Sequence, residues 1–169
     1  MRMMFGGDVM LGRTVGDYIL RLGPDYPLGP LFPLLHHADL VIVNLECAIT
    51  ARTRHWPGLP KAFCFAAPPD AAETLRGAGV GLVSLANNHT LDFGVEGLAD
   101  TLAALDAQAV LHTGAGANLG QATRAAIPVE RIVEAVLQTR ELLLFGLKQQ
   151  TAQIFELLLI LQQSRRFVL

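Results

Sequence analysis

The feature that most constrains the fold is a series of short apolar runs separated by segments with helical periodicity. Continuous apolar runs such as 40–43 are typical of strands buried on both faces of a parallel sheet, and the helical segments between them would form crossover connections. We predict strands at 1–5, 40–43, 80–85 and 109–112, and helices at 14–21, 31–37, 69–76, 95–107 and 119–125, with 50–69 irregular. The predicted fold class is α/β, a βαβ sheet with helices on its faces.

Composition excludes several classes of protein. The chain has 13 basic and 15 acidic residues, a net charge of −2 and no basic stripe, so we expect no nucleic-acid partner. It is 51% hydrophobic, which is ample for a core. No stretch approaches the ~18 apolar residues of a membrane span, and no signal peptide is recognisable, so we expect a cytoplasmic chain. The two cysteines form no C-x-x-C pair, which favours reduced thiols.

A composition shift near Pro128 predicts a domain boundary, with one domain at 1–128 and a tail at 129–169. The tail is rich in Leu, Gln and Glu and nearly free of Gly and Pro, which predicts one or two helices broken at Gly146; a strand at 141–146 is the alternative. Apolar residues in the tail point in nearly all directions, so such helices need cover on every side. We therefore expect self-association through this tail.

Polar side chains follow three of the predicted strands where each strand ends. They are Asp8 after the first strand, Asn44 and Glu46 after the second, and Asn88 and His89 after the third. Because the carboxyl ends of parallel strands meet at one edge of a sheet, we expect these five side chains to converge there.

The chemistry of this set suits a divalent cation. Carboxylates, carboxamide oxygens and an imidazole are ligands for Mg²⁺, Mn²⁺, Zn²⁺ or iron. A bound metal could polarise a phosphoryl or carbonyl oxygen, and His89 could bind the metal or protonate a leaving group. Each cluster alone is more often a turn or a helix cap, but three clusters at one sheet edge favour a shared site.

Several motifs resemble those of the bacterial capsule-synthesis CapA (poly-γ-glutamate synthesis) family. They occur in the family's order and spacing between residue 2 and about residue 128. The motifs are 7–13 (GDVMLGR), 39–46 (DLVIVNLE), a Lys-x-Phe-x-Phe stretch at 61–65, 84–94 (SLANNHTLDFG) and 114–118 (GAGAN). The combination is far more specific than any one of them.

The resemblance implies a calcineurin-like metallophosphoesterase fold, here a partial sandwich. It also implies metal ligands at Asp8, at Asn44 or Glu46, and at Asn88. His89 would then act on the transition state or leaving group. We assign three further motif residues to substrate binding: Arg13, Lys61 and Asp92.

Two departures from the superfamily pattern predict an incomplete metal site. Met10 stands where typical phosphoesterases have a histidine ligand, and a thioether is a poor ligand for a hard cation. After His112 the chain has no histidine, although the superfamily takes further ligands from its C-terminal half. We therefore expect a C-terminally truncated chain: a broken gene, a fragment or a short variant completed by a partner.

Two functions follow as hypotheses. The first is a metal-dependent hydrolase of the phosphoesterase type associated with capsule or poly-γ-glutamate biosynthesis. The alternative is a non-catalytic accessory or polymer-binding protein of capsule synthesis, or an inactive fragment. The expected partners are the capsule polymer or its synthase.

Overall fold

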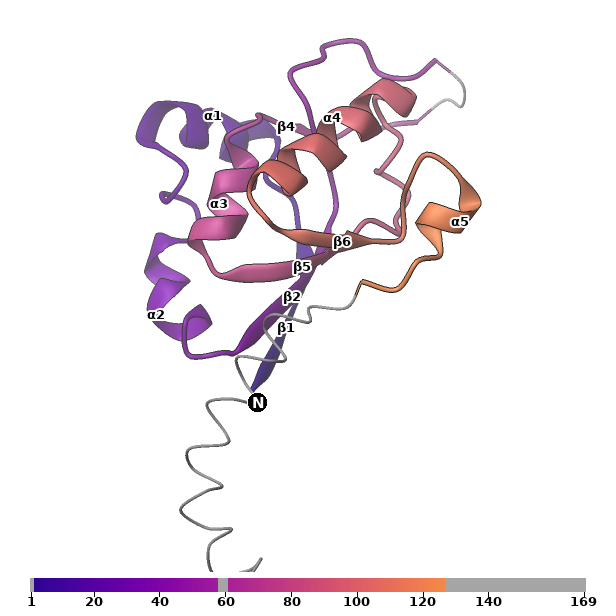
Figure 1. Ribbon diagram of the computed structural model, residues 1–169. Coiled ribbons are helices and arrows are strands. Elements are labelled where there is room, and N and C mark those ends of the chain that lie inside the picture. The colour runs from indigo at the N-terminus through magenta and orange to yellow at the C-terminus, as the bar shows by residue number, and fades with distance from the viewer. Residues whose placement is uncertain (1, 58–60, 127–169) are drawn as a thin grey trace, which may run out of the picture. The chain divides into compact units, whose positions relative to one another are not determined.

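A four-stranded parallel sheet forms the centre of the computed structural model, which describes residues 2–57 and 61–126 (Figure 1). Its strand order is β1-β2-β5-β6. The strands are β1 (Met3–Val9), β2 (Leu40–Leu45), β5 (Val80–Ser84) and β6 (Leu111–Thr113). All three neighbouring pairs are parallel, so the predicted α/β class with a mainly parallel sheet is confirmed.

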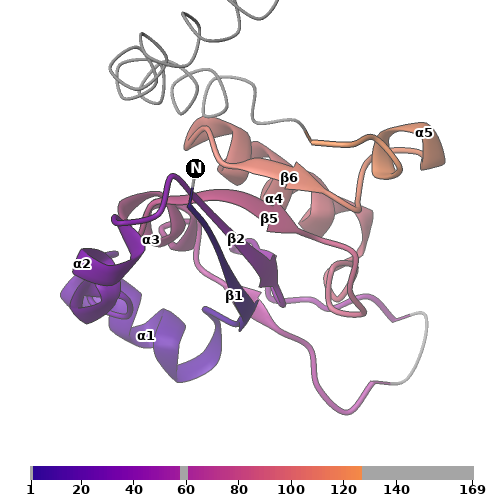
Figure 2. The ribbon, with the colours of Figure 1, turned by 90° about the horizontal axis from the view of Figure 1, so that it is seen from below.

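The connecting helices follow from this strand order. They are α1 (Arg13–Leu22), the 3₁₀ turn η1 (Gly29–Leu31), α2 (Phe32–Leu35), α3 (Ala71–Gly77), α4 (Gly94–Ala107) and α5 (Leu119–Ala122). Because the strands lie in the sheet in chain order, right-handed crossovers bring successive connections to the same face. Figure 2 shows α3 and α4 behind the strands on that face. No helix in the described part of the chain is both long enough and apolar enough to cross a bilayer.

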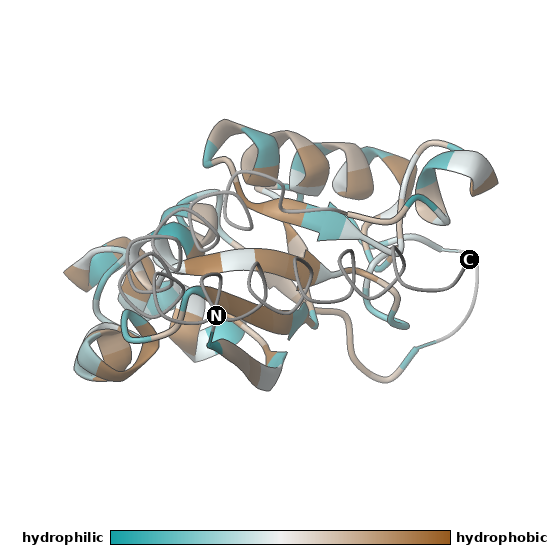
Figure 3. Cartoon of the chain, turned by 60° about the horizontal axis from the view of Figure 1, so that its bottom comes forward, coloured by the Kyte–Doolittle hydropathy of each residue, from teal (hydrophilic) through white to brown (hydrophobic). Residues whose placement is uncertain are grey.

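The two faces of the sheet differ in burial. Val41, Val43 and Val83 point into the helix-covered core and are at most 6% exposed. The central strands are correspondingly coloured as hydrophobic in Figure 3. The opposite face carries a row of apolar register partners, Phe5, Ile42, Leu82 and Leu111.

Two elements differ from the prediction. A small parallel sheet joins β3 (Ala48–Ile49) to β4 (Ala66–Ala67), where β4 lies in a stretch predicted to be irregular. Strands of two residues are too short to show an alternation in sequence. In addition, β1 continues through Gly6 and Gly7 to Val9, with a register shift between Phe5 and Asp8. Gly7 takes a positive φ of 67°, which glycine adopts without steric cost.

The C-terminal expectations concern residues outside the described ranges. They are the boundary at 128, the tail helices at 129–169 and self-association through that tail. The predicted cap of the last described helix is confirmed: the Asn118 side chain caps α5 by accepting a hydrogen bond from the Gln121 N–H at 3.0 Å. The helix is shorter than predicted, because it ends at Ala122 and not at residue 125.

The backbone at Gly12 approaches β4 too closely for a side chain. A Cβ there would lie 2.3 Å from the Ala66 carbonyl oxygen, and a backbone atom cannot move aside as a side chain can. We expect Gly12→Ala to lower the free energy of unfolding by about 2 kcal/mol or more. Gly29→Ala is the matched control, because nothing lies within 4 Å of a Cβ there. Urea denaturation measures both, and equal losses would contradict the close approach.

Candidate functional site

The strand register places the predicted polar residues on one edge of the sheet. Asp8, Asn44 and Ser84 are register partners across β1, β2 and β5. The Asn44 Nδ2 donates to Asp8 Oδ1 at 2.9 Å, and Asn44 Oδ1 accepts from Asn87 Nδ2 at 3.0 Å. The ends of the three strands are therefore joined by one chain of side-chain hydrogen bonds.

Asn87 fixes the segment that follows β5. Its Nδ2 also donates to the Leu45 carbonyl at 2.9 Å, and its Oδ1 accepts from the His89 N–H at 2.9 Å. The resemblance assigns metal binding to the asparagine of the Asn-His pair, which is Asn88, and Asn87 is not among the predicted site residues. The structure separates them: Asn87 is half-buried and hydrogen-bonded, whereas Asn88 is exposed and its side chain makes no hydrogen bond within the described residues.

His89 is buried, with 8% of its surface exposed, and is held on three sides. Its Nδ1 lies 2.7 Å from Asp92 Oδ2, and its Nε2 lies 4.0 Å from Glu46 Oε1. The ring stacks on Phe65 with the centroids 4.2 Å apart. Because an ionised carboxylate only accepts hydrogen bonds, Nδ1 carries the proton shared with Asp92, and Nε2 faces Glu46.

Asp92 is the most constrained carboxylate of the site. Its side chain is 1% exposed and accepts hydrogen bonds from Lys61 Nζ, from His89 and from the Phe65 N–H at 2.7 Å. Burial raises the pKa of Asp92, but the hydrogen bonds from Lys61, His89 and Phe65 outweigh it, so the pKa lies below its ordinary value. Substrate binding by Asp92 stays a prediction; its buried carboxylate is placed to orient His89.

Lys61 and Arg13 occupy different environments. Lys61 Nζ is bound to Asp92 and to the Asn88 carbonyl at 2.7 Å, so its charge is already partly compensated. The Arg13 guanidinium lies over the rings of Phe63 and Phe65, 5.0 and 5.1 Å from their centroids. Arg13 is exposed, so of these two predicted substrate-binding residues it is the freer to reach a ligand.

The carboxylate, carboxamide and imidazole groups of the site are of types that bind hard cations, but few of them lie close enough together to share one ion. A cation about 2.1 Å from each of two ligand atoms joins atoms at most about 4.2 Å apart. The 4.0 Å between His89 Nε2 and Glu46 Oε1 is near that limit. Within the described residues, no group of three or more His, Cys, Asp or Glu side chains could hold a metal ion. Met10 does not compensate, because its Sδ accepts from the Gly12 N–H at 3.1 Å.

The sheet is parallel, its crossover helices lie on one face, and a histidine–carboxylate pair lies at the carboxyl ends of its strands. This arrangement is consistent with a metallophosphoesterase-like α/β protein. The family model "Bacterial capsule synthesis protein PGA_cap" matches residues 2–153. The chain therefore belongs to this bacterial capsule synthesis family, as its motifs indicate. The match continues beyond residue 128, and the division of the chain there remains a prediction.

Relatives in several bacteria carry related names. The chain is 31% identical over 113 residues to "Capsule biosynthesis protein CapA" of Bacillus anthracis, covering 66% of this chain and 28% of that protein. It is 31% identical over 157 residues to a "Probable polyglutamine synthesis accessory protein" of Mycobacterium tuberculosis, covering 73% of this chain and 41% of that protein. It is 28% identical over 120 residues to "PGA biosynthesis protein CapA" of Bacillus subtilis, covering 71% of this chain and 31% of that protein. The chain thus spans well under half the length of these relatives.

The lowered pKa of Asp92 predicts a pH dependence of stability. Because the native pKa lies below the ordinary 3.8, ionised Asp92 stabilises the fold above pH 3.8, and this contribution is lost as the pH falls through the native pKa. We expect Asp92→Asn to cost roughly 2 kcal/mol of unfolding free energy at neutral pH, and the cost to shrink below about pH 4.

Chemical denaturation of both proteins between about pH 7 and about pH 3 measures this difference. Asp17→Asn, at an exposed position on α1, controls for the loss of a carboxylate. A cost for Asp92→Asn that stays constant across this range would contradict the assignment.

Proposed function

We propose that this chain serves capsule or poly-γ-glutamate biosynthesis as part of a metal-dependent hydrolase of the phosphoesterase type. Family membership and the names of the relatives support the biosynthetic role. The observation that carries the chemistry is the placement of His89, with Nδ1 bound to Asp92 and Nε2 directed toward Glu46.

His89 would transfer a proton at Nε2. Asp92 holds Nδ1 and so fixes the orientation and tautomer of the ring, in the same way that an aspartate supports a histidine in other acid–base pairs. Phe65 packs on the ring and excludes water from one side. With Nδ1 protonated, the Lys61 ammonium 3.3 Å from that nitrogen finds its acceptors on Asp92 and on the Asn88 carbonyl instead. Nε2 is therefore the nitrogen that can take up a proton and, once the ring is protonated on both nitrogens, donate it to the oxygen of a leaving group.

Oxygens of Asp8, Asn44, Glu46 and Asn88 would supply ligands for the cation. Asp8 is exposed and Asn88 has no side-chain partner within the described residues, so both can turn toward an ion. A bound Mn²⁺, Mg²⁺, Zn²⁺ or iron ion would polarise a phosphoryl oxygen and lower the pKa of a coordinated water. Because no group of three or more His, Cys, Asp or Glu side chains in the described part of the chain could hold a metal ion, we expect the ligand set to be completed by groups outside it.

His89→Gln tests the proton-transfer role. We expect metal-stimulated hydrolysis of an alkyl phosphate such as hexyl phosphate to fall by roughly 10²–10⁴-fold, because an alkoxide is a poor leaving group without proton transfer. His112→Gln is the control: His112 lies on β6, where its Nε2 is 3.2 Å from Asp106 Oδ1, and it makes no hydrogen bond or ion pair with the residues that hold His89 within the described part of the chain. Asp8→Asn should weaken Mn²⁺ binding at least about tenfold in calorimetric titration. A chain that binds no divalent metal and shows no metal-stimulated hydrolysis would refute the enzymatic proposal.

A non-catalytic role is the second candidate. Two observations favour it. No group of three or more His, Cys, Asp or Glu side chains in the described residues could hold a metal ion, and one relative is named an accessory protein. In this role the chain would bind the capsule polymer or its synthase without hydrolysing a substrate. Co-sedimentation with poly-γ-glutamate that is unaffected by His89→Gln and by chelation of metals would support it. Absence of both polymer binding and co-purification with a synthase would exclude it.

A further inference from the structure

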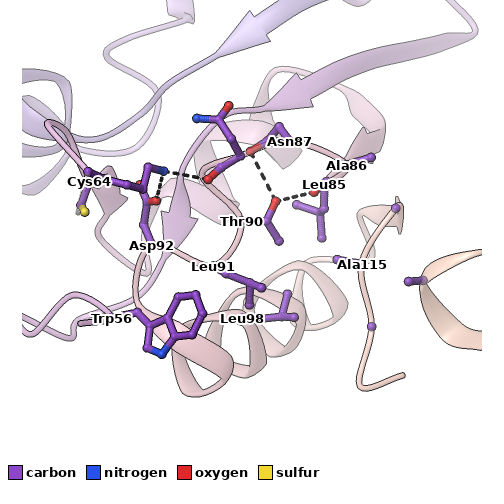
Figure 4. A pocket seen from close by; sticks show the side chains of 15 residues that line it. Trp56, Cys64, Leu85, Ala86, Asn87, Thr90, Leu91, Asp92, Leu98 and Ala115 are labelled. Carbon is purple, nitrogen blue, oxygen red and sulfur yellow. Dashed lines mark hydrogen bonds and ion pairs between the residues drawn. The ribbon is translucent and has the colours of Figure 1, made fainter. Parts of the chain in front are cut away.

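A cavity of about 730 Å³ adjoins the candidate site (Figure 4). The two share Lys61, Asn88 and Asp92. The remaining walls are mainly apolar and include Trp56, Leu85, Leu91, Leu98, Ala115 and Ala122. Small-molecule sites have volumes of roughly 300–1,000 Å³ and combine apolar walls with a few polar groups, and this cavity fits both criteria.

The wall of the cavity is tied to the candidate site. The Trp56 N–H donates to the Asp92 carbonyl at 2.8 Å, so the loop that carries the indole is fixed to the residue that orients His89. Thr90 is buried, and its hydroxyl donates to the Leu85 carbonyl. These bonds fix two segments of the cavity wall, and a wall that is already ordered lowers the entropy cost of binding.

The distribution of polarity along the cavity indicates an amphipathic ligand. Trp56 and Leu91 are 51% and 42% exposed at its walls, so an apolar group that covered them would gain from the burial of their surface. The polar end carries the Lys61 ammonium and the Asn88 side chain, which has no hydrogen bond to another described residue, and both can donate hydrogen bonds to an anion.

We propose that this cavity binds the apolar alcohol group of a phosphate monoester whose phosphate lies at the Lys61 and Asn88 end. This inference rests on the proposed phosphoesterase function and names the substrate class of that site. The leaving group would be the alcohol, and its oxygen would lie where the cavity meets the His89 side of the site.

The single tryptophan of the chain provides the measurement, because Trp56 is the only indole and lines the cavity. The probes are hexyl phosphate, methyl phosphate and 1-hexanol, titrated into the full chain without added metal while Trp56 emission is recorded. We expect a blue shift with hexyl phosphate and a half-saturation concentration at least about tenfold below that of methyl phosphate, since five more methylenes are buried. We expect 1-hexanol to bind at least about tenfold more weakly than hexyl phosphate, because it lacks the anionic group.

Matched variants locate the binding. Ala122→Phe fills the cavity and should abolish the preference for hexyl over methyl phosphate, whereas Ala103→Phe, at an exposed position on α4, should preserve it. Thermal unfolding checks that both variants fold. Leu91→Asp is the second cavity variant if Ala122→Phe does not fold, with Leu20→Asp on α1 as its control, since both leucines are exposed in the native chain.

The outcomes separate this inference from the proposed function. Equal binding of hexyl and methyl phosphate, or a preference that survives the cavity variants, overturns the apolar subsite. Equal binding of 1-hexanol and hexyl phosphate overturns the phosphate assignment. Selective binding of hexyl phosphate by a chain that shows no metal-stimulated hydrolysis supports the subsite while refuting the enzymatic proposal.

Discussion

The buried carboxylate of Asp92 is the interaction on which the arrangement of the candidate site depends. It accepts hydrogen bonds from His89, three residues away, and from Lys61 and the Phe65 backbone, which belong to one segment about 30 residues earlier in the chain. A charge that is 1% exposed would be costly without these donors, so the fold is constrained to deliver all of them. The same bonds orient His89, which means that the stability of this region and its chemistry share one cause.

The order of the strands is the second constraint. A sheet that grows in chain order, from β1 through β2 and β5 to β6, places its crossover helices on one face and all its strand ends on one edge. Asp8, Asn44 and Ser84 become neighbours through this register alone. Asn87 then ties the segment after β5 to β2, so that the position of His89 relative to Glu46 follows from backbone pairing and two side-chain bonds.

Much of this could be predicted because the signals are local. The apolar run that became β2 and the amphipathic stretch that became α4 have the lengths and periodicities of their classes, and the order of the polar clusters placed Asp8, Asn44 and His89 at one edge. The two-residue strands β3 and β4 carry no periodicity, and their pairing brings together residues 48 and 66, so nothing local specified it. The burial of Asp92 could not be predicted for a similar reason: a carboxylate in a motif is equally able to face a ligand or to be buried.

The sequence by itself determined the α/β class, the family and the set of polar residues available at the sheet edge, because these depend on residue type, periodicity and order along the chain. The tertiary structure alone decided which of two adjacent asparagines is bonded, that Lys61 neutralises Asp92, and that an apolar cavity adjoins them. Those outcomes depend on burial and on distances between segments that are remote in sequence. The free energy of a buried charge or of a cavity wall is fixed by its neighbours in space.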